Sequence, residues 1–314
     1  MKKRSALVLP LIFSISFFSA ARAAEKASAG ETNSPAPLPG GVTLQKDIEY
    51  VPGGGKSRTL DLYLPVSSGP MPLVIFIHGG GWRGGSKDGC PAKFLSGHGY
   101  AVASLNYRVS REAVFPAQID DCRAAIKFLR AHAAEYMLDS AHVGVWGGSA
   151  GGHLAALLGT SAAVDFSTMP AKVMEPGKVD ETIAVQCVVE MYGASDFTLL
   201  MADKGQVEHG VGKAAIQLMG SSADDPKLIE KSQWASPITY VRRDNPPFLL
   251  QHGDADRIMP LAQSRAMLAA LQAAGVDATL TVMPGADHAG APLFTAENFQ
   301  SLAEFFDRHL KTGK

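Results

Sequence analysis

A serine flanked by glycines is the residue of this sequence best suited to covalent chemistry. Ser149 lies in the segment 146–153 (WGGSAGGH), a G-x-S-x-G pattern that follows an apolar run and precedes a helix-forming stretch. In a sharp strand-to-helix turn the backbone is crowded, so glycine is needed at Gly147 and Gly151, and the serine Oγ projects from the turn. The N–H of Ala150 would face a reacting carbonyl at the positive end of the helix. The pattern predicts a nucleophilic serine, and a glycine-rich turn with an incidental serine is the alternative.

A serine hydroxyl becomes a useful nucleophile when a histidine takes its proton and an acid orients that histidine. In an α/β fold with this serine motif, the acid and then the histidine follow the serine, each on a loop after a late strand. Asp256 follows one late apolar run and His288 follows the next, so they are the predicted orienting acid and base for Ser149. Asp254 and Asp196 remain alternatives for the acid.

A second glycine-rich segment, residues 78–82 (HGGGW), directly follows the apolar run 73–77. Glycines in such a loop let backbone N–H groups turn toward a developing oxyanion, and one such donor contributes roughly 3 kcal/mol in serine hydrolases. The sequence therefore assigns the oxyanion hole to Gly80, Gly81 and Ala150. Structural support of the site is expected from the residues that shape its two turns: His78, Gly79, Trp82, Gly147 and Gly151.

The same loop also matches a dinucleotide-binding pattern, because Gly79, Gly81 and Gly84 satisfy G-x-G-x-x-G after a strand. A dinucleotide site would need an acidic residue about 20 residues further on, at the end of the next strand. The next apolar run ends in residues 105–107 (LNY), which contain no acid. The sequence therefore argues against a nucleotide cofactor, and no zinc-ligand spacing appears either.

Short apolar runs alternate with stretches of helical period along the rest of the chain. Seven runs are predicted strands: 59–64, 73–78, 101–106, 142–146, 184–191, 247–252 and 278–283. The clearest predicted helices cover 116–133, 260–274 and 296–311. Near-continuous apolar strands that alternate with helices are typical of a parallel sheet covered on both faces. The predicted fold class is α/β, with a mostly parallel central sheet.

Two long segments, 164–181 and 198–244, interrupt this alternation. Loops of that length inside a compact domain usually serve as lids or cap elements. No internal repeat or second domain is evident in the sequence. One catalytic domain is therefore expected over residues 42–314, with lid or cap insertions.

The N-terminus has the pattern of a secretory signal peptide. Basic residues at 2–4 (KKR) precede an apolar run over 6–18, and residues 21–23 (ARA) fit a cleavage site. The run is shorter than the roughly 20 residues that span a bilayer, and an uncleaved anchor is the alternative. We expect a signal peptide over 1–23, a flexible leader over 24–41, and an exported protein, periplasmic or secreted, with no stable membrane insertion after cleavage.

The charge balance excludes one class of partner. The chain has 29 Lys+Arg and 30 Asp+Glu, a net charge of −1. Removal of residues 1–23, which hold four basic residues and no acid, leaves 25 basic and 30 acidic residues and a net charge of −5. Because such a protein does not attract polyanions, nucleic acid is not an expected partner.

The chain contains three cysteines, Cys90, Cys122 and Cys187. For an exported chain, a disulfide between Cys90 and Cys122 is one hypothesis. Cys122 also falls on a helical stripe of apolar residues, so a small buried core residue is the alternative.

These motifs together resemble the α/β-hydrolase superfamily, in the esterase/lipase branch that has an HGGGW oxyanion loop. The resemblance rests on segments 78–82, 147–151 and 253–256 and on His288, and it spans about residues 45–311. Finer segments are similar to those of bacterial acetylxylan/feruloyl esterase domains and hormone-sensitive-lipase-like carboxylesterases: 106–108 (NYR), 115–118 (FPAQ) and 235–237 (ASP). The resemblance implies hydrolysis of an ester through an acyl-enzyme, without a metal or an organic cofactor.

The resemblance and the expected export point to a small-molecule or carbohydrate-linked ester with a small acyl, acetyl or feruloyl group, outside the cytoplasm. The same three residues would also suit an amide-directed serine hydrolase of the arylformamidase or prolyl-oligopeptidase type. A non-catalytic binding protein of the same fold is a third hypothesis. A comparison of turnover on esters and on amides distinguishes the ester hydrolase from the amide-directed hydrolase. Labelling of Ser149 by a fluorophosphonate distinguishes both enzymes from the non-catalytic binding protein.

Overall fold

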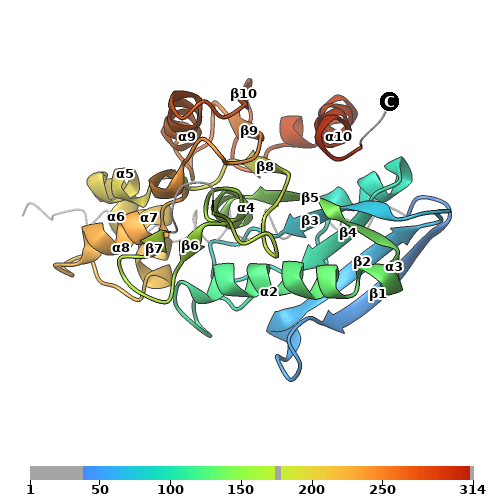
Figure 1. Ribbon diagram of the computed structural model, residues 1–314. Helices are drawn as coiled ribbons and strands as arrows, with labels where there is room; N and C mark the ends of the chain where they lie inside the picture. The colour runs from blue at the N-terminus through green and yellow to red at the C-terminus, as the bar shows by residue number, and fades with distance from the viewer. Residues whose placement is uncertain (1–37, 174–177, 312–314) are drawn as a thin grey trace, which may run out of the picture. The chain divides into compact units, whose positions relative to one another are not determined.

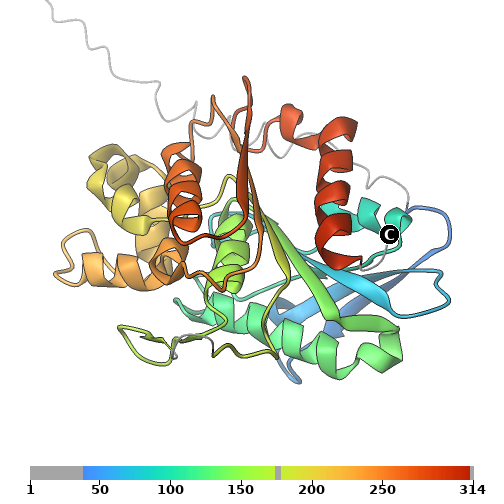
Figure 2. The ribbon, with the colours of Figure 1, turned by 45° about the horizontal axis from the view of Figure 1, so that its top comes forward.

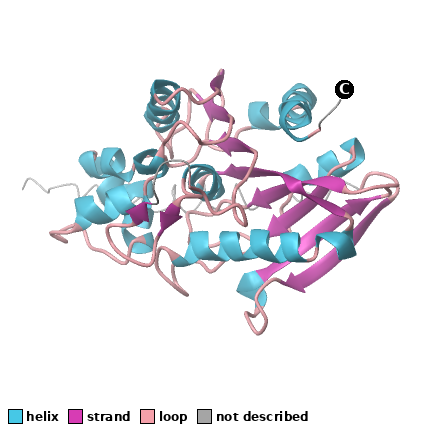
Figure 3. Ribbon diagram, viewed as in Figure 1, coloured by secondary structure: helices cyan, strands magenta, loops and turns pink. Residues whose placement is uncertain are grey.

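The computed structural model describes residues 38–173 and 178–311, and its centre is an eight-stranded sheet (Figures 1 and 3). The strand order is β1-β2-β4-β3-β5-β8-β9-β10. All pairs from β4 to β10 are parallel, whereas β2 pairs with β1 and with β4 in antiparallel fashion. The strands are β1 (Val42–Glu49), β2 (Thr59–Pro65), β3 (Met71–Ile77), β4 (Ala101–Leu105), β5 (Leu138–Gly148), β8 (Cys187–Met191), β9 (Phe248–Gly253) and β10 (Ala278–Met283). The predicted α/β class with a mostly parallel sheet is confirmed.

The central strands are buried because both of their faces are apolar. Every residue of β4 and of β8 is buried, and β3 has a single half-buried residue. The edge strand β1 alternates instead between half-buried and exposed residues, as expected for a strand covered on one face. The parallel strands β5, β9 and β10 end at the edge of the sheet where the loops that hold Ser149, Asp256 and His288 begin.

Helices cover both faces of the sheet. On one face, Ile75 shares an apolar core with α2 (Ala117–Ala131), α4 (Ala150–Thr160) and α9 (Ala262–Ala273). On the other face, Val74 and Phe76 share a core with the 3-10 helix η2 (Pro91–His98) and with α10 (Ala296–Leu310). This division follows from the strand period, since consecutive residues point to opposite faces. Figures 1 and 2 show α2 and α10 on opposite sides of the sheet.

The two predicted insertions contain regular structure. Four helices lie between β8 and β9: α5 (Phe197–Ala202), α6 (Lys204–His209), α7 (Val211–Leu218) and α8 (Leu228–Ala235). Figures 1 and 2 show them gathered on the far side of α4 from β1 and β2. The other insertion holds an antiparallel pair, β6 (Val164–Asp165) and β7 (Lys172–Val173). Short elements complete the described chain: η1 (Lys56–Arg58), α3 (Ala133–Tyr136), η3 (Pro237–Tyr240) and η4 (Ala291–Phe294).

All seven predicted strands occur, and β10 has the predicted bounds. The largest shift is at β5, which begins at Leu138 rather than at residue 142, because its first residues pair with the start of β3. The sequence patterns do not predict β1. Its sequence, VTLQKDIE, mixes charged and apolar residues, so no apolar run marks it as a strand. Its antiparallel pairing with β2 holds it in the sheet.

The hypothesis of a Cys90–Cys122 disulfide is wrong. Cys90, Cys122 and Cys187 are all free and buried. Cys122 lies in the core that contains α2, whereas Cys90 lies in the core that contains α10, so the sheet separates their sulfur atoms. The alternative interpretation of Cys122, as a small buried residue on the apolar stripe of a helix, is confirmed.

Within residues 38–173 and 178–311, no helix is long and apolar enough to cross a membrane. The same residues contain no group of three or more His, Cys, Asp or Glu arranged to hold a metal ion. The predicted signal peptide, residues 1–23, lies outside the described residues, as do residues 24–37 of the predicted leader.

Candidate active site

Ser149 lies in the tight turn between β5 and α4. Its backbone has φ 55° and ψ −121°, a strained conformation for a residue other than glycine, and its N–H donates to the Met191 carbonyl at 2.9 Å. A Cβ on Gly147 would lie 2.1 Å from the carbonyl oxygen of Gly151, and a Cβ on Gly151 would lie 2.0 Å from that of Ile77. No side chain fits at either place, so both glycines shape the turn that presents Ser149.

Three side chains on three different loops form one line of hydrogen bonds. His288 Nε2 lies 2.9 Å from Ser149 Oγ, and His288 Nδ1 lies 2.7 Å from Asp256 Oδ2. Asp256 follows β9 and His288 follows β10, at the same edge of the sheet as the serine turn. Because Asp256 accepts at Nδ1, that nitrogen carries a proton, and Nε2 is free to accept from the serine hydroxyl. The structure therefore brings together the predicted nucleophile, base and acid.

The Asp256 carboxylate is fixed on both of its oxygens. Its Oδ1 accepts the backbone N–H groups of Ile258 and Met259, both at 2.8 Å. Burial alone would raise the pKa of this carboxyl, but hydrogen bonds from His252, His288 and the Met259 N–H outweigh burial, and the pKa lies well below its usual range. The group therefore stays charged, with one oxygen directed at His288.

The two alternative acids have other partners. Asp254 Oδ1 accepts the N–H of Gly285 at 2.7 Å. Asp196 caps the N-terminus of α5 by accepting the N–H groups of Thr198 and Leu199. Among the hydrogen bonds of the described residues, neither carboxylate contacts His288. Asp254 therefore connects the loop after β9 to the loop after β10, and Asp196 fixes the start of α5.

The loop after β3 passes beside Ser149. A Cβ on Gly79 would lie 3.3 Å from the Ser149 Cβ. Gly80 and Gly81 have φ values of 116° and 59°, and a Cβ on Gly80 would lie 2.3 Å from the Gly84 carbonyl oxygen. The hydrogen bonds within the described part of the chain leave the N–H groups of Gly80 and Gly81 unused. Ala150 is the first residue of α4, where an N–H has no partner inside the helix.

His78 and Trp82 hold the two ends of this loop. His78 Nδ1 lies 2.7 Å from the Gly79 carbonyl oxygen, and its ring stacks on Tyr107 at 4.4 Å between centroids. Trp82 is fully buried and has φ 56°, which is unusual for a large residue. Its indole Nε1 donates to His153 Nδ1 at 3.1 Å. Packing and hydrogen bonds therefore keep the loop in its glycine-dependent conformation.

His153 connects this loop to the helices of the insertion. Because Nδ1 accepts from the indole, Nε2 must carry the ring proton, and it donates to the Ala235 carbonyl at the end of α8, 2.8 Å away. Burial lowers the pKa of His153 to about 4, so the ring is neutral. The Phe197 ring, at the start of α5, stacks on the same imidazole at 4.8 Å.

A surface ion pair joins the loops that carry Asp256 and His288. The guanidinium of Arg257 donates to Asp287 Oδ2, and the backbone N–H of Arg257 donates to Asp287 Oδ1 at 3.0 Å. The Arg257 hydrogen bonds lower the pKa of Asp287 to about 2. Because the pair is exposed, it adds little stability, although it connects the loop after β9 to the loop after β10.

The sequence patterns assign no catalytic or oxyanion-hole role to several residues that surround the site. The Tyr192 ring lies edge-on to His288 at 4.8 Å, and its backbone has φ 42°. Glu190, His252 and Ser264 are fully buried behind Asp256. The signal available for Glu190 is a charged residue inside the predicted apolar strand 184–191. The signal for Tyr192 is weaker, an aromatic residue directly after that strand, and Ser264 carries no signal.

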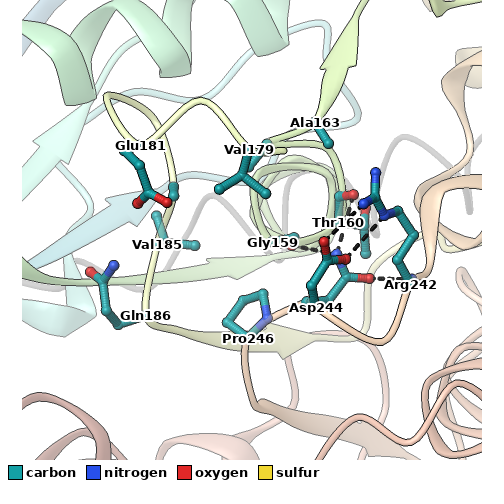
Figure 4. Close-up of a pocket in the computed structure, with 13 residues that line it drawn as sticks. Gly159, Thr160, Ala163, Val179, Glu181, Val185, Gln186, Arg242, Asp244 and Pro246 are labelled. Atoms are coloured by element: carbon teal, nitrogen blue, oxygen red, sulfur yellow. Dashed lines mark hydrogen bonds and ion pairs between the residues drawn. The ribbon is translucent and has the colours of Figure 1, made fainter. Parts of the chain in front are cut away.

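A cavity of about 290 Å³ lies at the other end of α4 (Figure 4). Its lining includes Gly159 and Thr160, together with the ion pair of Arg242 and Asp244. At a rise of 1.5 Å per residue, the length of α4 separates this cavity from Ser149 by roughly 15 Å. The cavity is therefore distinct from the line of hydrogen bonds at Ser149.

Known proteins share both the sequence and the fold of this chain. Residues 60–271 match the family model BD-FAE, a range that contains Ser149 and Asp256 and ends before His288. The chain is 35% identical over 258 residues to Esterase LipQ of Mycobacterium tuberculosis (strain ATCC 25618 / H37Rv), a match that covers 77% of this chain and 56% of that protein. The chain spans about half the length of the curated relatives it matches.

Solved structures give the same result at the level of the fold. A truncated form of a carbohydrate esterase from gut microbiota has a TM-score of 0.72 at 29% identity, with 86% of this chain and 97% of that chain covered. A bifunctional GH43-CE protein of Bacteroides eggerthii has a TM-score of 0.74 at 31% identity, with 85% and 35% covered. Since the family model matches more than half of the sequence, this chain belongs to the BD-FAE family, within the esterase/lipase branch of the α/β-hydrolase fold.

Proposed function

We propose that this protein is a serine carboxylic-ester hydrolase that acts through an acyl-enzyme. The observation that carries the proposal is the line of hydrogen bonds from Ser149 Oγ through His288 to Asp256, with distances of 2.9 and 2.7 Å. Among the described residues, the N–H groups of Gly80 and Gly81 have no hydrogen-bond acceptor, and their loop passes beside the same serine at Gly79. The similar proteins include an esterase and a carbohydrate esterase, which supports the same reaction class.

The reaction begins when Ser149 Oγ attacks the ester carbonyl and His288 Nε2 takes the serine proton. The N–H groups of Ala150 and of Gly80 or Gly81 stabilise the oxyanion, and Asp256 stabilises the imidazolium that forms. His288 then gives its proton to the leaving alcohol. Water attacks the acyl-enzyme with His288 as base, and the acid product leaves as Ser149 recovers its proton.

The proposed substrates are esters with a small acyl, acetyl or feruloyl group, on a small molecule or on a carbohydrate. Membership of the BD-FAE family and the likeness to a carbohydrate esterase support this choice. The signal-peptide pattern of residues 1–23 supports action outside the cytoplasm. No cofactor enters the proposed steps, because serine, histidine, carboxylate and backbone N–H groups supply each proton transfer and each charge contact.

The proposal is tested by hydrolysis of p-nitrophenyl esters from acetate to laurate, methyl ferulate, acetylated xylan and the amide N-formylkynurenine. Ser149→Ala is expected to lose at least roughly a thousandfold in turnover, because the nucleophile is removed. Ser68→Ala is the matched control, since Ser68 is exposed in the loop before β3. Turnover by Ser149→Ala within about tenfold of the unmodified protein would contradict the assignment of Ser149 as nucleophile. Faster turnover of the amide than of the esters would show that the protein is an amidase and not an esterase.

A further inference from the structure

Two arginines lie at the glycine loop after β3 without a carboxylate partner. Arg83 and Arg111 are both exposed, and among the described residues no ion pair includes either guanidinium. Their cationic neighbours in the chain, Lys87 and Arg108, are instead paired with buried aspartates. The charges of Arg83 and Arg111 are therefore available to a ligand.

The Arg83 guanidinium lies against Gly81, one of the glycines proposed for the oxyanion hole. A Cβ on Gly81 would lie 3.8 Å from Arg83 Nε and 3.9 Å from Arg83 Nη2. The Cβ of Ala214, on α7, would lie 4.0 Å from the same atom. The Arg83 side chain is therefore placed where the glycine loop meets a helix of the insertion between β8 and β9.

The loop after β4 holds Arg111 beside the same segment. The N–H of Ser110 donates to the Trp82 carbonyl at 2.7 Å, and Arg111 Nη2 donates to the Arg83 carbonyl at 2.8 Å. Two consecutive residues of one loop thus bind two consecutive carbonyl groups of the other. The Arg111 guanidinium is therefore held at a residue only two positions after Gly81.

The acidic residues of these two loops are directed elsewhere. Glu112 accepts the Ser57 hydroxyl with one oxygen, and with the other it accepts the Val109 N–H at 2.9 Å. Asp88 accepts the hydroxyl of a serine two residues before it. The whole chain has a net charge of −1, so attraction of an anion at the two arginines is a local effect.

We propose that Arg83 and Arg111 bind a carboxylate of the substrate, so that the preferred esters carry a negative charge near the reacting carbonyl. The inference rests on the proposed function and names its substrate class. A guanidinium presents parallel N–H donors that match the two oxygens of a carboxylate. Two nearby guanidinium groups without a carboxylate repel each other, and a bound anion removes that repulsion. A uronic acid unit of a carbohydrate and a small aromatic acid both supply such a carboxylate.

The first test compares two small esters that differ in charge, 4-acetoxybenzoate and the neutral 4-acetoxybenzamide. Arg83→Gln and Arg111→Gln each remove one positive charge. Each should lower kcat/KM for the anionic ester by roughly 3- to 20-fold, mainly through KM, because a charged hydrogen bond to the substrate is lost. The loss for the neutral ester should be at least about threefold smaller.

Two further variants separate charge from packing. Arg83→Lys keeps the charge and should retain kcat/KM for the anionic ester within about threefold. Arg308→Gln is the matched control, because Arg308 is exposed near the end of α10, where Leu310 packs on Gly144 of β5. About 0.5 M NaCl should reduce the effect of Arg83→Gln on the anionic ester, since salt screens exposed charges. Losses of equal size on the two esters would indicate a packing role and overturn the inference.

Acetylated xylans with and without glucuronic acid side groups identify the source of the carboxylate. If a uronic acid supplies it, Arg83→Gln should lower acetate release from the acidic xylan more than from the neutral xylan. An effect confined to 4-acetoxybenzoate supports the inference with a small acid as the source. The same loss on both xylans and on both small esters would contradict it.

A binding measurement distinguishes this inference from the proposed function. Calorimetric titration of Ser149→Ala and of Ser149→Ala/Arg83→Gln needs no turnover, and 4-acetoxybenzoate and a glucuronic-acid-substituted xylo-oligosaccharide are the two probes. Weaker binding of either anion by the double variant supports the inference, whereas equal binding of both anions overturns it. Absence of turnover and of fluorophosphonate labelling in the unmodified protein would overturn the proposed function instead.

Discussion

The backbone at Ser149 is strained, and close contacts around it hold the strain in place. The φ of 55° at Ser149 is costly for a residue with a side chain. The N–H of Ser149 is fixed to the Met191 carbonyl, and Gly151 packs against the backbone of Ile77 with no space for a Cβ. The position of the hydroxyl is therefore determined by neighbouring strands as well as by its own turn.

Gly151→Ala tests this explanation at the scale of one residue. The added Cβ would lie 2.0 Å from the Ile77 carbonyl oxygen, so β3 and α4 would have to separate. We expect a loss of at least about 3 kcal/mol in the free energy of unfolding, measured by denaturant unfolding. Gly69→Ala is the control, because a Cβ there has no atom within 4 Å. Equal stability of the two variants would show that the backbone accommodates the methyl group.

At the residue scale, the sequence predicts groups that belong to motifs and misses groups that act through packing. Ser149, Asp256 and His288 are predicted by a glycine-rich turn and by chain order, and the structure places their side chains within hydrogen-bond distance. Ser264 and Tyr192 have no motif. Their proximity to the site depends on how α9 and the loop after β8 pack, which residue spacing alone does not encode.

At the scale of elements, one hydrogen bond joins the glycine loop after β3 to α4. Trp82 Nε1 donates to His153 Nδ1 inside a buried cluster. Trp82→Phe would leave that nitrogen unsatisfied, at a cost of about 1–3 kcal/mol, and would loosen the loop that holds Gly80 and Gly81. We expect a lower melting temperature and a kcat reduced by roughly 3- to 30-fold, with a smaller change in KM.

The matched control for this variant is Trp234→Phe. Trp234, on α8, has a buried indole Nε1 with no hydrogen-bond partner in the described chain. Its replacement removes an unsatisfied donor, so stability and kcat should change little. Both variants lose aromatic volume, but only Trp82→Phe loses a hydrogen bond. A comparison of their kcat values and melting temperatures therefore isolates the effect of the hydrogen bond. Identical behaviour of the two would show that the Trp82 hydrogen bond has no effect on the glycine loop.

The elements that the sequence predicts are those with a strong apolar run or a clear helical period. β4 and β8 are buried throughout and are apolar except for Ser104 and Glu190, so their composition indicates strands. β1 and the helices α5–α8 are less clear, because their residues alternate between packed and exposed surroundings that only the tertiary structure defines. The patterns in 198–244 therefore predict an insertion but give no helix bounds.

At the scale of the whole molecule, the sheet divides the interior into two cores, and the cysteines lie in both. Cys122 is in one core, whereas Cys90 and Cys187 are in the other. The disulfide hypothesis failed because cysteine number and expected export say nothing about which face of a sheet each sulfur occupies. Stability must therefore come from packing and hydrogen bonding rather than from a covalent link among the described residues.

This arrangement predicts that a reducing agent has no effect on stability. Excess dithiothreitol should change the melting temperature by less than about 1 °C, whereas loss of a disulfide worth roughly 2–5 kcal/mol would lower it by several degrees. Differential scanning fluorimetry with and without the reductant makes the comparison. Thiol titration of the denatured, unreduced protein should count the three free cysteines.

The hydrogen bond from His153 to the carbonyl of Ala235 has a consequence for engineering and for divergence within the family. It makes the end of α8 part of the same buried unit as the glycine loop. A chimera that exchanges the segment between β8 and β9 to alter selectivity would also exchange the acceptor that fixes this imidazole. Grafts that place a backbone carbonyl within hydrogen-bond distance of His153 Nε2, as Ala235 does, should therefore retain turnover more often than grafts chosen by segment length alone.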